Sequence, residues 1–299
     1  MRLPVPFHIS TLAYFDPGLC PETDVVIEAW EYIPLIVADA ATQMAIDAEL
    51  VELCSRSARG AFLRFYFMSP PAVTIGRNQR WRAVIDPELC RRNGWDWVRR
   101  PTGGGSLLHH REINYAVAAT QNMFLCPPSD APQSVFQQVA DGLLAGLVRL
   151  GLQPHLNVSR KERIGGGQVS AHGLCGAALT RYEISIDGQK AVAAAQWNLS
   201  NASLQHGTIY LRAPGPEDTF WPESPSLALQ PGPQKWWAFG SGGTASLHDR
   251  RSALANALKA GLGETLGVSW RDSSDSWVHS PEVAARKDRW RAERWHERR

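Results

Sequence analysis

Apolar residues in this chain follow two spacings, one typical of half-buried strands and one typical of amphipathic helices. Between them lie clusters of Gly, Pro, Ser and Asn, which are typical of turns and loops. The pattern predicts strands over residues 30–36, 62–67, 72–75, 95–99, 106–109, 113–119, 182–186, 190–196 and 203–211. It predicts helices over residues 40–54, 86–93, 134–150, 247–266 and 281–299. Strands and helices do not alternate strictly, so we expect a mixed α+β fold rather than a parallel βαβ array.

Capping residues fix several of the predicted helix ends. Asp39 precedes the helix that carries Met44, Ala45, Ala48 and Val51 on one apolar side, and an N-terminal Asp accepts hydrogen bonds from the first amides of a helix. Asp86 and Pro87 give the same signal for the second helix. The helices that begin near 134 and 247 are predicted to stop at Gly151 and Gly267, respectively. Residues 214–243 are rich in Pro, Gly, Ser and Trp, and we expect an irregular loop there.

Composition and charge narrow the class of protein. The chain has 299 residues, of which 44% are hydrophobic and 20% charged, as in ordinary globular proteins. A net charge of +2 gives no argument for nucleic acid or anionic membrane as a partner. No apolar run is long enough to cross a bilayer. Residues 1–28 form an extension without the pattern of a signal peptide, and the five cysteines form no C-x-x-C pair. We therefore expect a cytoplasmic protein without a metal site.

The most distinctive motif joins two arginines to three glycines. Arg99 and Arg100 precede Gly103-Gly104-Gly105, between two runs that are predicted to be strands. Glycine allows the backbone to approach a ligand closely and to present its N–H groups, while the arginines favour a carboxylate, phosphate or carbonyl. A surface hairpin with solvated arginines explains the same residues, and the spacing alone does not separate the two interpretations.

Cys175 is the cysteine whose surroundings favour chemistry. It follows a polar, Gly-rich segment and lies near His172, whereas Cys54 and Cys90 occupy apolar helix positions and are expected to be structural. A free cysteine is most often buried in the core, but an exposed loop thiol near basic groups is a candidate nucleophile. Both interpretations remain open for Cys175 on composition alone.

A second group of candidates lies on the predicted strands after residue 182. Asp187-Gly188 predicts a tight hairpin, after which Lys190 enters an Ala-rich strand. Small residues there leave room for a slender ligand, or for close packing of the backbone. Lys190 is by position more often an ordinary hairpin lysine, and His109 and His206 are more often structural than catalytic.

Four blocks of sequence together resemble the lipoate/octanoate attachment family, which contains lipoate–protein ligases and octanoyltransferases and is related to biotin protein ligases. The resemblance extends from about residue 30 to about residue 267. The blocks are residues 63–76, including Leu63-Arg64-Phe65-Tyr66 and Thr74-Ile75-Gly76; residues 99–109; residues 182–196, including Tyr182-Glu183-Ile184; and Leu204-Gln205-His206-Gly207-Thr208-Ile209. Each block is weak alone, but their order and spacing make the combination specific.

The resemblance implies a fold and a division of the chain. It implies a biotin/lipoate protein ligase-like catalytic domain of the α+β class, with a bent, largely antiparallel sheet flanked by helices and a tunnel for an acyl chain. We expect this domain over residues 29–270, after an N-terminal extension of residues 1–28 and before a C-terminal helical segment of residues 271–299.

The resemblance also implies residue roles. Cys175 precedes Glu183 by eight residues, a spacing found in the cysteine-dependent octanoyltransferases, and Leu108-His109-x-x-Glu112-x-x-Tyr115 resembles the same branch. Cys175 is then the nucleophile, and Lys190 holds the carbonyl oxygen of the acyl group. The residues expected to bind substrate are Arg99, Arg100, Gly103, Gly104, Gly105, His109, Gly76, Ala193, Ala194, Ala195, His206 and Gly207. The implied donor is an acyl carrier protein, and the implied acceptor is a lysine of a lipoyl-carrier domain, like the glycine cleavage H protein or a dehydrogenase E2 domain.

Departures from the pattern keep two alternatives open. Gly105 replaces an arginine that is common in cysteine-dependent transferases and resembles the ligases, while Ala193 replaces a usual glycine. The first alternative is an ATP-dependent lipoate–protein ligase, which needs ATP and Mg²⁺, whereas the transferase needs no cofactor. The second is a non-catalytic module that binds lipoate.

Overall fold

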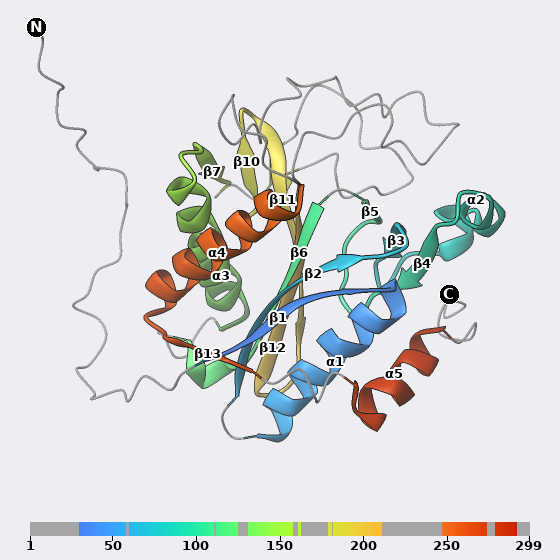
Figure 1. Cartoon of the computed structure of the whole chain (residues 1–299), viewed down its shortest axis with the longest axis horizontal. Coiled ribbons are helices and arrows are strands. Elements are labelled where there is room, and N and C mark those ends of the chain that lie inside the picture. Colours follow the sequence, from blue (N-terminus) through green and yellow to red (C-terminus); the bar gives the residue numbers. More distant parts are fainter. Residues whose placement is uncertain are drawn as a thin grey trace, which may run out of the picture.

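A computed structural model describes residues 30–57, 60–110, 112–124, 131–157, 161–162, 179–180, 182–210, 247–273 and 279–291. These residues form one large sheet with helices on both faces and a small sheet at one side (Figure 1). The predicted N-terminal extension, the loop predicted over residues 214–243 and Cys175 lie outside the described residues.

The large sheet has eight strands, and most neighbouring pairs are antiparallel. Only β13, β1 and β2 run parallel to one another; every later pair in the order β2-β6-β12-β11-β10-β7 is antiparallel. The expected largely antiparallel sheet is therefore confirmed. Its strands, in spatial order, are β13 (Trp270–Asp272), β1 (Trp30–Ala38), β2 (Ala61–Met68), β6 (Glu112–Thr120), β12 (Ala202–Tyr210), β11 (Gln189–Asn198), β10 (Ile184–Ile186) and β7 (Pro154–Leu156).

A second sheet of three strands carries the Arg-Gly motif. Its central strand β3 (Ala72–Ile75) pairs in parallel with β4 (Asp96–Arg99) and antiparallel with β5 (Leu107–His109). The three glycines lie in the connection from β4 to β5. Shorter elements are η2 (Trp81–Ala83), α2 (Pro87–Arg92), η3 (Gln121–Met123) and the paired strands β8 (Lys161–Glu162) and β9 (Leu179–Thr180).

Four long helices cover the two faces of the large sheet (Figure 1). On one face, α3 (Ala131–Arg149) and α4 (Leu247–Leu266) pack against each other and against an apolar cluster. Gly146 allows this contact, because a Cβ there would lie 2.6 Å from Cα of Leu258. On the other face, α1 (Ala40–Arg56) lies against the sheet and is itself covered by α5 (Pro281–Arg291). The fold is a sheet between two helical layers.

Strand alternation explains why the two faces differ. Along β6, Ile113, Tyr115 and Val117 belong to the apolar cluster below α3 and α4. Ala116 and Ala118 belong to the cluster below α1. Successive side chains of a strand point to opposite faces, so one face receives large apolar groups and the other receives small ones. The small groups leave space beside α1 for the site described below.

Most predicted local signals are confirmed. The Asp39 side chain accepts the amide hydrogen of Thr42 at 2.8 Å, so it caps α1 as predicted. Asp86 caps α2 in the same way. Asp187 and Gly188 both have positive φ, of 51° and 72°, as a tight hairpin requires. The pattern does not predict β7 and β13, since each has only three residues and depends on pairing with a distant strand.

The division of the chain into an extension, a catalytic domain and a C-terminal segment stays a prediction. The expected domain boundary at residue 270 falls within β13, which extends the sheet beside β1. Among the described helices, none combines the length and apolar character needed to cross a bilayer.

Candidate active site

A half-open pocket lies where the small sheet meets the large one, beside α1. The space at this pocket, with the open solvent at its mouth included, is about 300 Å³. Seven of the residues that sequence analysis assigns to substrate binding line it. They are Arg100, His109, Ala193, Ala194, Ala195, His206 and Gly207. The remaining lining residues are Met44, Tyr66, Met68, Thr74, Leu107 and Asn114.

Small residues on two neighbouring strands give the pocket its space. Ala193, Ala194 and Ala195 lie on β11 and pair with Thr208, Gly207 and His206 of β12, respectively. Gly207 has no room for a side chain, because a Cβ there would lie 2.3 Å from the carbonyl oxygen of Ala193. Larger side chains at these positions would fill the pocket. The sequence-based expectation of a slot next to the Ala-rich strand agrees with this geometry.

Apolar groups from α1, β2 and β5 also line the pocket. Met44 lies on α1 and is buried, while Met68 ends β2 and is partly exposed. Leu107 contributes from β5. Methionine is flexible and adapts to irregular shapes, so this wall suits an aliphatic chain. The apolar character of these residues predicts only burial, so their place in the pocket does not follow from the sequence.

The glycine loop is fixed by Arg100. Its Nη2 donates to the carbonyl oxygens of Gly103 at 2.7 Å and Gly105 at 2.6 Å. Gly104 has a φ of 90°, a conformation that favours glycine, and a Cβ there would lie 2.9 Å from the same guanidinium nitrogen. Arg100 is buried, so the interpretation of a surface hairpin with solvated arginines is wrong for this residue.

Arg99 and Gly76 have positions that differ from those expected. Nη1 of Arg99 donates to the carbonyl oxygens of Gly76, Arg77 and Gln79, at 3.1, 3.1 and 2.7 Å. Gly76 is absent from the pocket lining, because it lies against the glycine loop: a Cβ on it would be 1.9 Å from the carbonyl oxygen of Gly104. Gly76, which is expected to bind substrate, packs its backbone closely against the glycine loop instead of lining this pocket. Arg99 shapes the adjoining turn.

His206 is held between a threonine and a carboxylate. Its Nε2 lies 2.7 Å from Oγ1 of Thr102, and its Nδ1 lies 2.8 Å from Oδ2 of Asp47. The other carboxylate oxygen of Asp47 lies 3.2 Å from Nε of Arg64, and both of these side chains are fully buried. Burial lowers the pKa of His206, with Asp47 opposing the shift and Arg100 and His109 adding to it.

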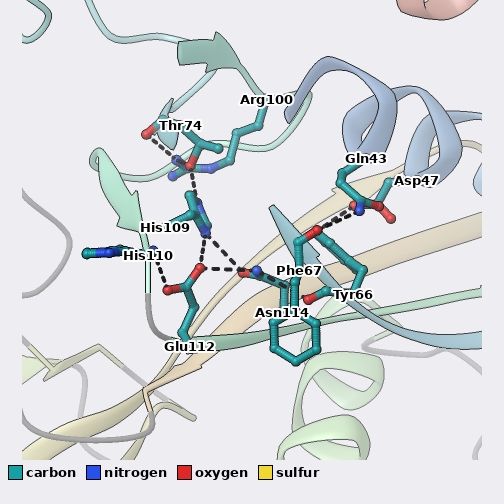
Figure 2. Close-up of polar contacts among 10 residues, drawn as sticks. All are labelled: Gln43, Asp47, Tyr66, Phe67, Thr74, Arg100, His109, His110, Glu112 and Asn114. Atoms are coloured by element: carbon teal, nitrogen blue, oxygen red, sulfur yellow. Dashed lines mark hydrogen bonds and ion pairs between the residues drawn. The ribbon is translucent and has the colours of Figure 1, made fainter. Parts of the chain in front are cut away.

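His109 has a matching arrangement (Figure 2). Its Nε2 lies 2.9 Å from Oγ1 of Thr74, and its Nδ1 lies 3.2 Å from Oε1 of Glu112 and 3.0 Å from Oδ1 of Asn114. Burial alone would raise the pKa of Glu112, but its hydrogen bonds with the His109 ring and the His110 amide hold that pKa below its ordinary value. Both histidines lie in the polar wall of the pocket.

Lys190 forms a buried ion pair outside the pocket lining. Its ammonium nitrogen lies 2.7 Å from Oε1 of Glu183, and both side chains are almost completely buried. This burial excludes the interpretation of Lys190 as an ordinary hairpin lysine. Glu183 follows Tyr182, whose φ of 67° marks a turn before β10. Glu183, which belongs to the Tyr182-Glu183-Ile184 motif, is therefore also the ion-pair partner of Lys190.

The described cysteines do not compete for the role expected of Cys175. Cys54 and Cys90 are free and buried, and burial is the main reason that each has a pKa of about 12. A thiol with such a pKa is almost never ionised near neutral pH and is a poor nucleophile. Their predicted structural role is confirmed. In the part of the chain that the structure describes, no group of three or more His, Cys, Asp or Glu side chains is arranged to hold a metal ion.

Three charged residues of the site are not identified as functional from the sequence. Asp47, Glu112 and Arg64 appear there only within a helix or a sequence motif. Asp47 lies between the apolar helix positions Met44 and Val51, and Arg64 lies between two core residues of β2. A charged residue at a position that should be buried is the signal that identifies both.

Comparison with known proteins identifies the family of this chain. Residues 39–220 match the family model of the lipoyl protein ligase A/B catalytic domain, which is more than half of the chain. A relative from Moorella thermoacetica, an octanoyltransferase LipM, is 34% identical over 64% of this chain and 68% of its own length. The LipM octanoyltransferase of Kyrpidia tusciae is 32% identical over 62% of this chain and 67% of its own. The LipM octanoyltransferase of Staphylococcus epidermidis is 27% identical over 90% of this chain and 98% of its own length.

Solved structures share the fold at lower identity. Lipoate-protein ligase A bound with ATP superimposes with a TM-score of 0.67 at 18% identity, over 90% of this chain and 98% of its own. The bi-partite lipoate protein ligase of Thermoplasma acidophilum, described with its E2 lipoyl domain, gives a TM-score of 0.63 at 18% identity, over 90% and 96%. The fold is that of the lipoate-protein ligases.

The fold, the pocket and the motifs around it define a catalytic domain of the enzymes that attach lipoyl or octanoyl groups to proteins. The chain belongs to the lipoyl protein ligase A/B catalytic domain family. It is an octanoyl/lipoyl transferase enzyme of the protein lipoylation system.

Proposed function

We propose that the enzyme moves an octanoyl or lipoyl group from an acyl carrier protein to a lysine of a lipoyl-carrier domain, through a thioester on Cys175. The observation that carries this proposal is the pocket itself, whose alanine and methionine walls suit an aliphatic chain and whose remaining wall is polar. At about 0.8 kcal/mol per buried methylene, a chain of this length would gain several kcal/mol from such a pocket. The names of the curated relatives favour the same acyl group.

The proposed reaction has two balanced steps. The Cys175 thiolate attacks the carbonyl carbon of the carrier's thioester, a new C–S bond forms, and the carrier leaves as its own thiolate. The amine of the acceptor lysine then attacks the thioester on Cys175 and loses a proton, and an amide forms as Cys175 leaves as thiolate. Lys190 would place positive charge beside the thiolate and the developing oxyanion. Its buried contact with Glu183 fixes where that charge lies.

The acceptor is proposed to be a lipoyl domain of the type that accompanies related ligases. The Thermoplasma acidophilum ligase was solved as part of a system that includes its E2 lipoyl domain. A folded domain presents its lysine at an exposed position, and a half-open pocket allows that amine to approach the acyl carbonyl.

A direct test is to incubate the full chain with octanoyl-carrier protein in the absence of ATP and to measure its intact mass. We expect one octanoyl adduct, which peptide mapping places on Cys175 and which Cys175→Ser abolishes. Cys90→Ala is the matched control, since Cys90 is buried away from the pocket, and it should keep the adduct. Absence of the adduct from the wild-type enzyme would overturn the thioester mechanism.

Lys190 can be tested with two variants, because removing one partner of a buried ion pair commonly destabilises a protein. Lys190→Ala should abolish transfer. The double variant Lys190→Met/Glu183→Gln removes both charges and should fold more stably than the single variant but remain inactive. If the folded double variant transferred octanoyl groups at the wild-type rate, the role assigned to Lys190 would be wrong.

The alternative function is that of an ATP-dependent lipoate–protein ligase. The observation that favours it is Gly105, where the resemblance to cysteine-dependent transferases calls for arginine. In that reaction the glycine loop and Arg100 would hold an acyl-adenylate, and Cys175 would be dispensable. Transfer that requires ATP and free acid, and that survives Cys175→Ser, would establish the ligase. No adduct and no turnover with or without ATP would leave the non-catalytic lipoate-binding module.

A further inference from the structure

Two buried chains of hydrogen bonds meet at Arg100 in the wall of the pocket. One passes from Asp47 through His206 to Thr102, and the other from Glu112 through His109 to Thr74 (Figure 2 shows the second). Arg100 contacts both threonine hydroxyls, Thr102 through Nε at 3.1 Å and Thr74 through Nη1 at 3.3 Å. We call these two chains the relays. Neither has an assigned role in the proposed reaction.

The acids determine which ring nitrogen of each histidine carries the proton. Nδ1 of His206 faces the carboxylate of Asp47, which only accepts when ionised. Nδ1 of His109 faces the carboxylate of Glu112 and Oδ1 of Asn114, and the amide nitrogen of Asn114 donates to that same carboxylate at 3.3 Å. All of these facing atoms are acceptors. Each histidine therefore has its hydrogen on Nδ1.

The opposite ring nitrogen must then accept. A neutral histidine with hydrogen on Nδ1 has a lone pair on Nε2, and burial keeps His206 neutral at pH 7 by lowering its pKa. A threonine hydroxyl has one hydrogen to donate. Thr102 gives it to His206 and Thr74 gives it to His109. Each hydroxyl oxygen therefore turns its lone pairs toward Arg100, which can only donate.

We propose that the relays act together as a positioning device that fixes Arg100, and through it the glycine loop, with Asp47 and Glu112 setting the direction of every hydrogen bond. Arg100 is held by Nε and Nη1 on the two threonines, so its Nη2 is directed to the carbonyl oxygens of Gly103 and Gly105. His109 and His206 are positioning residues in this assignment. The base of the reaction is not among them, because each ring is already committed at both nitrogens.

The consequence for the substrate lies in the loop amides. Arg100 occupies two of the loop carbonyls, and the third, that of Gly104, lies against Gly76. Within the described residues, the backbone amides of Gly103, Gly104 and Gly105 donate no hydrogen bond. Amides held in a fixed loop can stabilise negative charge on a substrate oxygen without having to reorganise. Gly103, Gly104 and Gly105 do not themselves line the pocket, so the relays act on the substrate site through Arg100, a lining residue that holds this loop in place.

The direction of the relays can be tested without any assay of transfer. In the ¹⁵N-labelled enzyme near neutral pH, His109 and His206 should both show a protonated Nδ1 and an unprotonated Nε2. Thr102→Val keeps the shape of the side chain and removes its hydroxyl, so it should shift the Nε2 signal of His206 and leave that of His109 in place. Thr74→Val should do the reverse. A hydrogen on Nε2 of either histidine in the wild-type enzyme would overturn the proposal.

The effect on the loop has a second readout and a matched control. Thr102→Val should accelerate hydrogen exchange at the amides of Gly103–Gly105, and Thr102→Ser should restore the wild-type rates. Thr120→Val is the control. Thr120 is also buried, but it is the last residue of β6, and its hydroxyl donates to the carbonyl oxygen of Gly60 and not to a histidine of the relays. It should lower stability without changing exchange in the loop. Equal exchange in Thr102→Val and wild type would refute the positioning role.

The effect on catalysis rests on the proposed function. Losing one hydrogen bond to a charged group should lower kcat/KM by about tenfold or more in Thr102→Val, with Thr102→Ser close to wild type. If Thr102→Val transfers at the wild-type rate, the catalytic part of the inference is wrong. If the wild-type enzyme transfers no acyl group, the proposed function fails, and the relays are judged by the histidine spectra and the exchange rates alone.

Discussion

The two faces of the large sheet differ in what they bury. The face below α3 and α4 is packed with large apolar side chains such as Phe65, Ile113 and Leu143. The face below α1 combines many alanines with larger apolar groups such as Ile46 and Leu50, and it also buries Asp47 and Arg64. Burying charges stabilises a fold little, if at all, compared with burying apolar groups of the same size. The comparison indicates that the first face holds the fold together and the second face holds the chemistry.

The largest effect is expected from breaking the charged pair of the α1 face. Asp47→Ala leaves Arg64 without its carboxylate partner and removes one end of the relay through His206. Loss of one partner of a buried pair costs about 3–5 kcal/mol, so we expect a marked fall in the free energy of unfolding together with loss of activity. Urea denaturation and an acyl-transfer assay measure the two effects.

The double variant Asp47→Ala/Arg64→Met sharpens this test. It removes the uncompensated charge, so much of the stability should return while activity stays low. A double variant that regained both stability and activity would show that the α1 face does not separate chemistry from stability in the way described.

A comparable change on the face below α3 and α4 should lower the free energy of unfolding without changing the kinetics. Leu143 is buried on α3, and truncation to alanine leaves a cavity that costs about 2–5 kcal/mol. We expect Leu143→Ala to unfold at lower urea concentration, with kcat and KM unchanged at a temperature where it is folded. A change in KM comparable with that of the pocket variants would contradict the division between the two faces.

Gly76→Ala should lower the rate of transfer far more than it lowers stability. The added methyl group would meet the carbonyl oxygen of Gly104, so the glycine loop has to move. Displacing a substrate-positioning element by about 1 Å can cost a factor of about 10² in rate, whereas overpacking costs only about 1–3 kcal/mol of stability. Steady-state kinetics and thermal unfolding of the same sample distinguish the two. A variant with full activity would show that the loop tolerates movement.

Lowering the pH should reduce the stabilisation that comes from the buried polar groups beside α1. The pKa of His206 is lowered by burial in the folded enzyme, so the unfolded state binds its proton first. The stabilisation from this group is complete above its ordinary pKa of 6.5 and declines as the pH falls below that value. Glu112, whose folded pKa is also lowered, adds a further decline below its ordinary 4.5. The partly buried Asp141 carboxyl, whose pKa is raised to about 6 by burial, acts in the opposite direction over part of this pH range. The test therefore uses Asp141→Asn, whose denaturation midpoint should decrease as the pH drops below 6.5. A flat profile of that variant down to pH 5 would contradict the assignment.

The smallest effect concerns the buried thiols. Cys54 lies within the α1 face and Cys90 beneath the small sheet, and burial raises the pKa of both to about 12. Iodoacetamide should leave both unmodified in the native enzyme and alkylate them only in urea. Rapid native labelling of Cys54, detected by peptide mass, would mean that the α1 face opens far more often than its packing indicates.

The sequence predicts local structure in this enzyme well, because the signals are local. Asp39, Asp86 and the Asp187-Gly188 hairpin act on neighbouring amides, and all three behave as expected. The short strands β7 and β13 are not predictable in this way, since three residues form a strand only when a distant partner is present. The overall sheet follows from the resemblance to a family and would not follow from periodicity alone.

The site is predictable in part for the same reason. Glycines, arginines and alanines in the motifs identify the loop and the pocket wall. The pairing of Asp47 with His206 joins residues 159 positions apart, which no pattern along the chain reveals. The same holds for Thr102 and His206. Sequence therefore identifies the residues that touch the pocket better than the residues that hold them in place.

The position of β1 has a consequence for how the chain is made. This strand is the first described element, and it lies between β2 and β13. Its partners in β13 are residues 270–272, so a ribosome has to synthesise some 240 further residues before that side of the strand is hydrogen-bonded. During translation the nascent sheet carries an open edge, and such edges invite pairing with other chains. Pairing with β13 thus protects this edge only once nearly all of the described chain has been synthesised.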